Sequence, residues 1–401
     1  MFKMHEKGKI VTLALLLALP ASAYAAEPQA TAPAAEQTAP AASGDSSTTS
    51  SSGQEATSSA AQTKASLTDS LKGGYTTAAT KMRVPWSMQF AGDTVYITQR
   101  VGGIVQVKNG KQTLQKVQTK KPLRVVGEAG LTGFVLDPNF AKNKMAYIYH
   151  AYEEKGEGFN RIVKVKLTGN TWKEQSELLK GIPGGRIHEG GRLAIGPDGM
   201  LYSTSGETNR RELSQDLDSY GGKILRMTTA GKIPKDNPIK NSYVYAYGLR
   251  NSQGIAWTSD GKLYASDHGP SGAPIPGGGT DRTGLDEMNL IKPGANYGWP
   301  EVMGKETATG MTPPLYVAGS KAIAPSGIAV TPDDTILVAT LAGESLKEFD
   351  PKTKKMTNVL TGVGRVRDVA VHNGKIYVLT NNTSGGNGNP GANDDRLLIL
   401  K

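Results

Sequence analysis

RIHEGGRLAIGPDGMLYSTSGE, residues 186–207, joins a tight-turn sequence to an alternating strand sequence. Pro197-Asp198-Gly199 supplies the turn, because Asp-Gly adopts positive φ at little cost. Residues 200–205, MLYSTS, then read as a short strand that follows the turn. His188, one of five histidines in the chain, precedes the turn and the strand. The stretch therefore predicts a reactive side chain on a loop above a rigid sheet.

The same turn and strand pattern recurs along the chain in six copies. The alternating runs are VYIT at 95–98, AYIYH at 146–150, LYSTS at 201–205, LYASD at 263–267, ILVAT at 336–340 and IYVLT at 376–380. Several are followed by a second strand pattern, and the spacing matches one four-stranded blade plus its loops. We therefore predict an all-β fold, a six-bladed β-propeller of four-stranded antiparallel blades. A β-sandwich or a two-domain β protein is the alternative for this spacing.

Either end of the folded part is a candidate for closing the ring. The segment 75–89 and the C-terminal run LLIL at 397–400 both have strand character. Long helical periodicity is essentially missing, and the 49 glycines and 22 prolines of the chain are typical of a loop-rich β protein. Polar side chains are then expected to gather where the loops converge at one end of the central channel.

The N-terminal region is read separately from the fold. Three lysines precede the apolar run 10–19, and small residues at 21–25 follow it, so residues 1–26 are expected to be a secretory signal peptide. The apolar run is too short to span a bilayer. Residues 27–66 are rich in Ala, Ser, Thr, Pro and Gln and are expected to be a disordered linker. The propeller is assigned to 67–401, and the mature protein is expected to be secreted or extracytoplasmic, in the periplasm or the cell-wall space.

Composition narrows the functional classes. The chain has 401 residues, a formal net charge of +10 and no cysteine, which excludes disulfides and a thiolate catalyst. A positive charge of this kind suits an acidic surface, a small polyanion or nucleic acid. The sequence has no basic run interleaved with aromatic residues, so a nucleic-acid partner is not expected.

Six motifs in order carry a resemblance to a known family. They are GEAGLTGFVLDPNF at 127–140, RIHEGGRLAIGPDG at 186–199, YGLRNSQGIAW at 247–257, SDHGP at 266–270, DEMNLIKPGANYGWP at 286–300 and GRVRDVAV at 364–371. The chain from about residue 85 onward resembles the glucose/sorbosone dehydrogenase family. Its members are soluble quinoproteins that oxidise sugars with pyrroloquinoline quinone (PQQ) and calcium. Each motif is weak alone, but their shared order is specific.

His188 and Arg250 are the candidate catalytic residues. A neutral imidazole can take a proton from an alcohol, and a nearby guanidinium can hold charge that develops on an oxygen. The resemblance implies that His188 removes the proton of the anomeric hydroxyl while a hydride passes to the quinone. It also implies that Arg250 stabilises the oxygen of the reduced ring, and that the product is a lactone. The alternative for His188 is a structural, hydrogen-bonding histidine.

The resemblance implies further contacts with the cofactor and the sugar. The cofactor-binding residues are Asn251, Gln253, His268, Arg365 and Arg367, and the substrate-binding residues are Glu128 and Glu207. Two arginines separated by one residue on a strand point to the same face, where they can grip a carboxylated ring. The alternatives are a solvated basic strand and ordinary surface carboxylates.

The resemblance also implies two calcium sites. The carbonyl groups of Gly269 and Pro270 match the pair that holds the cofactor's calcium, because calcium prefers oxygen donors, which include backbone carbonyls. Glu287 and the carbonyl of Tyr297 match a second, structural site, with Asp286 as a helper. The alternative for Glu287 is a solvent-facing acid, since no dense acidic loop surrounds it.

Two departures from the family pattern concern the cofactor pocket. After ILVAT the family has a lysine that reaches the quinone, whereas this chain reads TLAGE with Ala342 at the expected position. The contact is lost unless Lys347 or another lysine replaces it. The glycine-rich loop 271–285 is also longer than expected, and the alternatives for it are to cover the site, to alter substrate choice or simply to be a flexible loop.

Three functional hypotheses follow. The first is a PQQ- and calcium-dependent dehydrogenase that oxidises a small-molecule sugar and passes electrons to an external acceptor. The second is a propeller that binds a sugar or glycan without redox chemistry. The third is a calcium-dependent lactone or ester hydrolase, which needs several carboxylates around one metal ion. No such cluster of carboxylates can be assembled from the sequence.

Overall fold

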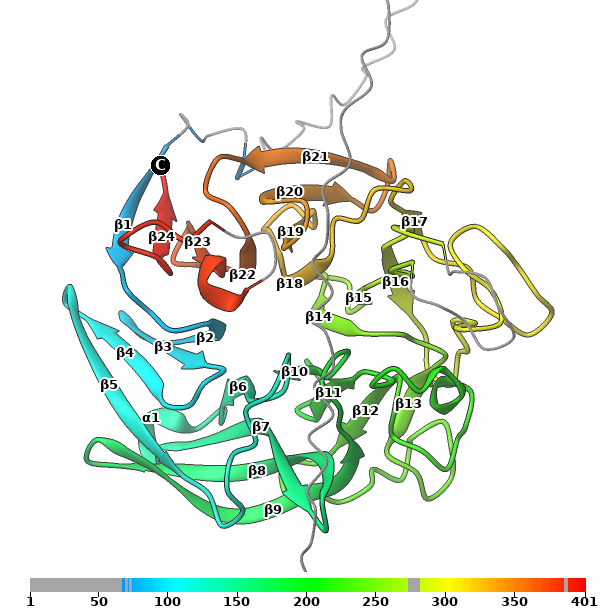
Figure 1. The fold of residues 1–401 in the computed structure, drawn as a ribbon, viewed down its shortest axis with the longest axis horizontal. Helices are drawn as coiled ribbons and strands as arrows, with labels where there is room; N and C mark the ends of the chain where they lie inside the picture. The colour runs from blue at the N-terminus through cyan, green and yellow to red at the C-terminus, as the bar shows by residue number, and fades with distance from the viewer. Residues whose placement is uncertain (1–66, 69–70, 72–73, 273–281, 386–388) are drawn as a thin grey trace, which may run out of the picture. The chain divides into compact units, whose positions relative to one another are not determined.

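The computed structural model describes most of the predicted propeller (Figure 1). The chain divides after Ala61, and everything described below belongs to the unit Gln62–Lys401. The predicted signal peptide (1–26) and linker (27–66) lie outside the described residues. The described residues are 67, 68, 71, 74–272, 282–385 and 389–401.

Helix is scarce in this part of the chain. The described helices are the single turn α1 (Phe140–Asn143) and the 3₁₀ turns η1 (Arg211–Ser214) and η2 (Asn382–Ser384). The prediction of an all-β protein is therefore confirmed. Across the described ranges, no helix combines the length and the apolar character needed to cross a membrane.

The strands form antiparallel sets of four, and within five sets chain order runs from an inner strand to an outer one. The sixth set contains the last three strands of the chain and the first. The sets are β2 (Pro85–Ala91), β3 (Thr94–Gln99), β4 (Ile104–Lys108) and β5 (Lys111–Gln118); β6 (Leu131–Leu136), β7 (Met145–Glu154), β8 (Glu157–Thr168) and β9 (Thr171–Pro183); β10 (Gly190–Ile195), β11 (Leu201–Ser205), β12 (Lys223–Met227) and β13 (Val244–Tyr247); β14 (Ser252–Trp257), β15 (Leu263–Asp267), β16 (Glu287–Ile291) and β17 (Tyr316–Val317); β18 (Pro325–Val330), β19 (Ile336–Thr340), β20 (Ser345–Asp350) and β21 (Lys355–Leu360); β22 (Val366–His372), β23 (Lys375–Thr380), β24 (Leu397–Leu400) and β1 (Tyr75–Ala79).

Two of these sets are joined, which corrects the prediction of six separate sheets. Four sheets have four strands, and the remaining eight strands form one sheet in the order β2-β3-β4-β5-β9-β8-β7-β6. The join is a short parallel pairing of β5 with β9, between residues 116–118 and 171–173. The paired residues are the first three of the outer strand β9, next to the β8–β9 turn, and they lie beside the open edge of β5. An unpaired edge accepts such a partner readily.

The inner strands form a closed cycle. β2 contacts β6, β6 contacts β10, β10 contacts β14, β14 contacts β18, β18 contacts β22, and β22 contacts β2. Figure 1 shows the sheets radiating from this cycle. β1 pairs with β24 in the last sheet, so an N-terminal strand and the C-terminal strand close the ring together. Such a ring of radiating sheets is the arrangement of a β-propeller.

The six predicted turn and strand repeats become the second strand of each set: β3, β7, β11, β15, β19 and β23. Four of them, β3, β11, β15 and β19, are buried at every position, because sheets pack on both of their faces. Trp172 of the outer strand β9 packs edge-on against Tyr96 and Phe134, with ring centroids 5.6 and 5.3 Å away. Apolar contacts of this kind hold neighbouring sheets together and fix the inner strands in place.

Candidate active site

Every inner strand carries a β-bulge near its first residues. A bulge bends its strand and changes the direction of the side chains it carries. The register shifts lie between Pro85 and Met88, Leu131 and Phe134, Gly190 and Leu193, Ser252 and Gly254, Pro325 and Ile328, and Val366 and Asp368. Residues at these bulges supply most of the polar contacts at the centre of the ring.

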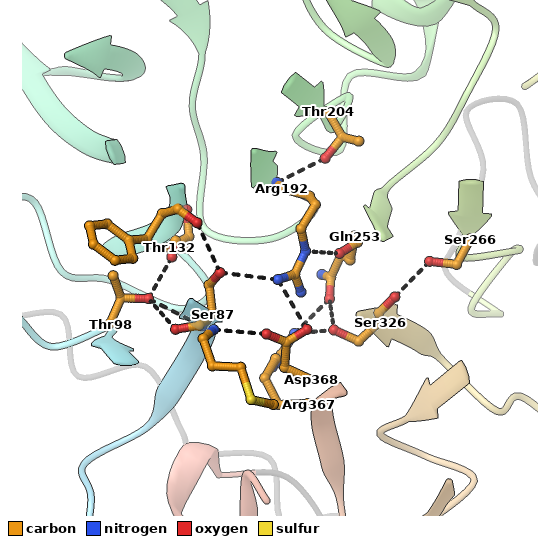
Figure 2. Close-up of polar contacts among 12 residues, drawn as sticks. Ser87, Thr98, Thr132, Arg192, Thr204, Gln253, Ser266, Ser326, Arg367 and Asp368 are labelled. Carbon is orange, nitrogen blue, oxygen red and sulfur yellow. Dashed lines mark hydrogen bonds and ion pairs between the residues drawn. The ribbon is translucent and has the colours of Figure 1, made fainter. Parts of the chain in front are cut away.

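A buried polar network crosses that centre (Figure 2). The Arg192 Nε atom donates to the backbone oxygen of Gln253 (2.7 Å), and its Nη1 donates to Ser87 Oγ (3.2 Å). The same Nη1 lies 3.1 Å from Asp368 Oδ1. The second oxygen, Asp368 Oδ2, accepts the backbone N–H of Met88 at 2.9 Å. Arg192 and Asp368 therefore form a buried ion pair that joins β10 to β22.

Arg367 is tied to the same network. Its Nη1 donates to Gln253 Oε1 (2.6 Å) and to Ser326 Oγ (3.2 Å), and its Nε and Nη2 both donate to Asn381 Oδ1. Burial, followed by the neighbouring Arg365, lowers the pKa of Arg367 to about 9. Gln253 thus accepts hydrogen bonds from two arginines, through its side chain and through its backbone.

A cavity of about 270 Å³ lies against this network. Its wall includes the predicted cofactor residues Gln253, Arg365 and Arg367 and the predicted substrate residue Glu128. Arg367 lies in β22 and Arg365 directly precedes that strand. Both line the same cavity, as their spacing predicted. Trp86 and Arg100 also line the cavity, and the guanidinium groups of Arg192 and Arg367 lie 4.4 and 5.7 Å from the centre of the Trp86 ring.

His188 is held next to the cavity by two carboxylates. Its Nδ1 lies 2.8 Å from Glu207 Oε1, and its backbone N–H donates to Glu128 Oε2 at 2.9 Å. The neighbouring residues Ile187 and Glu189 line the cavity. With the carboxylate accepting the proton of Nδ1, Nε2 is the basic nitrogen of the ring. His188 has a φ of 57°, a strained value for a residue with a side chain, and such strain is typical of functional loops.

Glu207 joins His188 to Arg250. The Arg250 Nε atom lies 3.9 Å from Glu207 Oε1, the oxygen that His188 contacts. The backbone N–H of Glu207 donates to the carbonyl oxygen of Arg250 at 3.0 Å. Glu207 is only 1% exposed. The candidate catalytic pair is thus brought together by a carboxylate that the sequence suggested only as a sugar contact, and its role toward the sugar stays a prediction.

Asn251 and His268 lie behind this group. The Asn251 side chain accepts the backbone N–H of Gly190 through Oδ1 (3.0 Å), and its Nδ2 lies 3.4 Å from His268 Nδ1. Burial lowers the pKa of His268 to about 4, with Asp286 opposing the shift, so the imidazole is neutral at neutral pH. Asp267 accepts the backbone N–H groups of Arg250 and Asn251 through its two oxygens. Burial raises the pKa of Asp267 to about 6.

The predicted calcium turn is positioned by Asp286. Its Oδ1 accepts the backbone N–H of Gly269 (2.8 Å), and its Oδ2 accepts those of Ile323 and Ala324. This carboxylate is therefore used to hold the turn at Gly269 rather than left open for a metal ion. Pro270 is buried next to it. Residues 273–281 of the long loop lie outside the described residues, so the expectations for that loop are not addressed.

Glu287 and Tyr297 line one small pocket. The Glu287 carboxylate accepts a hydrogen bond from Asn289 Nδ2 at 3.1 Å. Burial, followed by the negative charge of Asp267, raises the pKa of Glu287 to about 8. In the part of the chain that the structure describes, no group of three or more His, Cys, Asp or Glu side chains is arranged to hold a metal ion.

The lost lysine has no replacement at Lys347. Its Nζ donates to Asn358 Oδ1 at 2.6 Å, across the outer strands β20 and β21 and away from the cavity. Leu341 lines the cavity after β19, and Ala342 is exposed. The positive charges that do line the cavity come from arginine: Arg100, Arg186, Arg365 and Arg367.

Comparison with known proteins decides the family. The sequence profile described as Glucose / Sorbosone dehydrogenase matches residues 82–388, which covers the ring from before β2 to beyond β23. The chain belongs to the glucose/sorbosone dehydrogenase family. The resemblance inferred from the six motifs is therefore confirmed.

Two curated proteins of known name are similar to this family member. Quinoprotein glucose dehydrogenase B of Acinetobacter calcoaceticus is 32% identical over 273 residues, covering 59% of this chain and 55% of that protein. Aldose sugar dehydrogenase YliI of Escherichia coli (strain K12) is 30% identical over 353 residues, covering 76% of this chain and 89% of that protein. The alignment thus spans about half of the first relative and most of the second.

Solved structures are similar over the ring as well. The PQQ-bound form of aldose sugar dehydrogenase from Streptomyces coelicolor has a TM-score of 0.72 at 36% identity, covering 81% of this chain and 96% of that one. The apo-form of the soluble aldose sugar dehydrogenase from Escherichia coli has a TM-score of 0.70 at 27% identity, covering 82% and 99%. Both likenesses extend over nearly the whole length of the solved chain.

Sequence reasoning missed four residues of the site. Trp86 and Arg100 follow no motif that was singled out, and only their positions at a strand start and a strand end hint at the channel. Arg192 and Asp368 stand inside two of the quoted motifs, but nothing in the sequence showed that they pair. The sequence offers one signal for each: Arg192 is a charged residue directly after a Gly-Gly pair, and Asp368 is a charged residue inside an apolar strand.

Proposed function

We propose that this protein is a PQQ- and calcium-dependent dehydrogenase that oxidises an aldose at the anomeric carbon to a lactone, on a six-bladed propeller of four-stranded blades. The observation that carries the proposal is the shared carboxylate. Glu207 holds His188 at 2.8 Å and lies 3.9 Å from Arg250, beside an arginine-lined cavity. The names of the quinoprotein and aldose dehydrogenase relatives and the PQQ-bound neighbour support the cofactor and the substrate class.

The residues around the cavity fit a carboxylated, planar cofactor. The Nε atoms of Arg100 and Arg365 are buried and have no hydrogen-bond partner among the described residues. Burial lowers the pKa of both arginines, an unfavourable state that an anionic ligand relieves. Arginine binds carboxylates through paired N–H donors, and Trp86 offers an aromatic surface on the same wall. Arg100, Arg365, Arg367 and Gln253 are the residues proposed to hold PQQ.

The chain's own groups divide the work of the reaction. When bound, PQQ supplies a quinone that accepts a hydride. His188 Nε2 takes the proton of the anomeric hydroxyl, and Glu207 keeps the other ring nitrogen protonated and stabilises the imidazolium that forms. Arg250 places a positive charge next to the reacting group, where negative charge develops on oxygen. We assign Glu207 to the positioning of His188, and Glu128 remains the proposed sugar contact.

Calcium fits donors that are mainly backbone oxygens. The carbonyls of Gly269 and Pro270 are proposed to hold the cofactor's calcium, while Asp286 fixes the turn that presents them. Glu287 and the Tyr297 carbonyl are proposed for the second site. A buried carboxylate with a pKa of about 8 lacks a compensating charge, and a divalent cation would supply it. Sites built from carbonyls need no cluster of acidic side chains.

Stability in calcium-free buffer is expected to fall with rising pH because of Glu287. Its pKa is 4.5 in an unperturbed chain and about 8 in the folded protein. The folded state therefore holds the proton more tightly, so the contribution is full at low pH and is lost as pH rises through this window. Urea unfolding at about pH 5 and about pH 8 should show a larger loss for the wild type than for Glu287→Gln.

Added calcium is the control for that prediction. At the higher pH, calcium should raise the stability of the wild type more than that of Glu287→Gln, because only the wild type offers the ion an ionised carboxylate at this site, while both keep the carbonyl site at Gly269 and Pro270. An equal gain for both proteins would mean that Glu287 is not a ligand.

The test of the proposed function is reconstitution. Purified protein is mixed with PQQ and calcium, and aldoses are added while the optical spectrum of the quinone is followed. Reduction of the quinone on addition of an aldose supports the proposal. Sugar binding without a spectral change would favour a propeller that only binds glycans. We also propose that an external acceptor takes the electrons and that the protein works outside the cytoplasmic membrane, on the strength of the signal-peptide pattern at 1–26.

A further inference from the structure

Lys223 is a fully buried lysine that has no carboxylate within ion-pair distance among the described residues. It is the first residue of β12 and is 0% exposed. Its Nζ donates to three backbone oxygens, of Leu213 (2.6 Å), Ser214 (3.1 Å) and Gly221 (2.6 Å). No ion pair joins it to an acidic side chain in the described ranges. A buried ammonium is costly, so its place in the fold needs a reason.

The three carbonyls belong to one connection, residues 206–222, between β11 and β12. This connection begins with Gly206 and Glu207 and contains the 3₁₀ turn η1. Three inward-pointing carbonyl oxygens are the kind of site that proteins use for a hard metal cation. Here the ammonium group of Lys223 supplies the positive charge in place of a metal ion, and its three N–H donors match the three carbonyl acceptors.

The same connection is bonded to the segment that carries Arg250. Ser214 Oγ donates to the carbonyl of Leu249 (2.7 Å), and the carbonyl of Ser214 accepts the N–H of Gly248 (3.0 Å). Glu207 N–H donates to the carbonyl of Arg250 at 3.0 Å. Ser214 therefore touches Lys223 on one side and the approach to Arg250 on the other. Displacing the connection would move Glu207 and Arg250 together.

We infer that Lys223 is a positioning residue whose ammonium takes the place of a structural metal ion. By binding three carbonyls of the 206–222 connection, it fixes the conformation in which Glu207 and Arg250 lie next to His188. The catalytic part of this inference rests on the proposed function. The geometric part does not, because the contact of His188 with Glu207 exists without substrate or cofactor. Removing the ammonium takes the Nζ donor from all three carbonyls, of which, among the described residues, only that of Ser214 keeps another donor, the N–H of Gly248, and the connection loosens.

The experiment compares Lys223→Met with Arg161→Met in protein without cofactor. Arg161 is a matched control because it is also a buried cation, 1% exposed, but lies on β8 and pairs with Glu174 (2.8 Å) and Glu177. The first readout is the downfield proton resonance of His188 Nδ1–H, assigned by its loss in His188→Gln. The second is amide hydrogen exchange in 206–222 and 247–251. Lys223→Met should lose the resonance and speed exchange in both segments, whereas Arg161→Met should leave both unchanged.

Turnover in the reconstituted enzyme supplies a third readout. Misplacing a catalytic group by about 1 Å costs about 100-fold, so kcat of Lys223→Met should fall roughly 10- to 100-fold with the sugar KM changed less than about twofold. If Lys223→Met does not fold, Lys223→Gln, which keeps two N–H donors, is used for the same comparison. An unchanged His188 resonance, or an equal loss in Arg161→Met, overturns the inference. Absence of any aldose oxidation by the wild type would instead refute the proposed function, while the resonance and exchange data still decide the role of Lys223.

Discussion

Replacing His188 with Gln is expected to lower the rate of aldose oxidation by about 10²- to 10⁴-fold, the usual contribution of a general base. Glutamine retains an N–H that can donate to Glu207, but its amide nitrogen cannot accept a proton. The residues proposed to hold PQQ, such as Arg367 and Gln253, are bonded to each other and not to His188. Uptake of PQQ should therefore be unchanged. The rate is measured with PQQ and calcium added in excess, and uptake by titration of the apo-protein.

His372→Gln is the matched control for this substitution. His372 contacts the carbonyl of Gly92 through Nε2 at 2.9 Å and stacks on Phe90, near the turn between β2 and β3. Its replacement removes an imidazole of the same kind without touching the cavity, so turnover should stay at the wild-type rate. Turnover of His188→Gln within about tenfold of the wild type would mean that another group takes the proton.

Much of the fold could be predicted because its strands are marked by local turn chemistry. Asp198-Gly199 and Asn373-Gly374 each precede a strand that the structure contains, β11 and β23. The pairing of β5 with β9 could not be predicted in this way. It depends on whether the open edge of β5 lies beside residues 171–173, which already pair with β8, and that proximity is set by how neighbouring sheets pack.

The site was predictable where a motif carries its residues and not where geometry creates the contact. His188 and Arg250 were paired by residue type and resemblance, and the structure places both against Glu207. The contacts that Glu207 makes with His188 and Arg250 could not be predicted, because the sequence does not show which groups a loop residue faces. The bulges of the inner strands were invisible as well. A bulge is a difference in register between two strands, and one strand's sequence does not contain it.

Replacing Asp368 with Asn is expected to lower the free energy of unfolding by about 3–5 kcal/mol, because it leaves the guanidinium of Arg192 buried without its counter-charge. Asn has nearly the shape of Asp, so the loss arises from charge and not from a cavity. The backbone packs closely on the carboxylate, since a Cβ atom on Gly327 would lie 1.9 Å from Asp368 Oδ1. Urea unfolding followed by circular dichroism measures the change.

The double variant Arg192→Met with Asp368→Leu separates stability from function. Removing both charges spares the cost of burying them, so the double variant should recover part of the stability that Asp368→Asn loses, although the N–H of Met88 is left without its acceptor. The hydrogen bonds from Arg192 to Gln253 and Ser87 are nevertheless lost, and Gln253 is the acceptor that fixes Arg367. One such bond to a charged group contributes about 1.5–3 kcal/mol, so PQQ should bind about tenfold more weakly or worse.

Quenching of tryptophan fluorescence by PQQ gives that affinity directly, because Trp86 lines the cavity. In the wild type its ring lies next to the guanidinium groups of Arg192 and Arg367. A stable double variant with weakened binding would show that the central ion pair orients the residues that face the cofactor. If the double variant binds PQQ as tightly as the wild type, Arg192 and Asp368 only hold the inner strands together and do not orient the cofactor-binding residues. The first outcome is expected, since hydrogen bonds join Arg192 to Gln253 and Gln253 to Arg367 (Figure 2), and both Gln253 and Arg367 line the cavity.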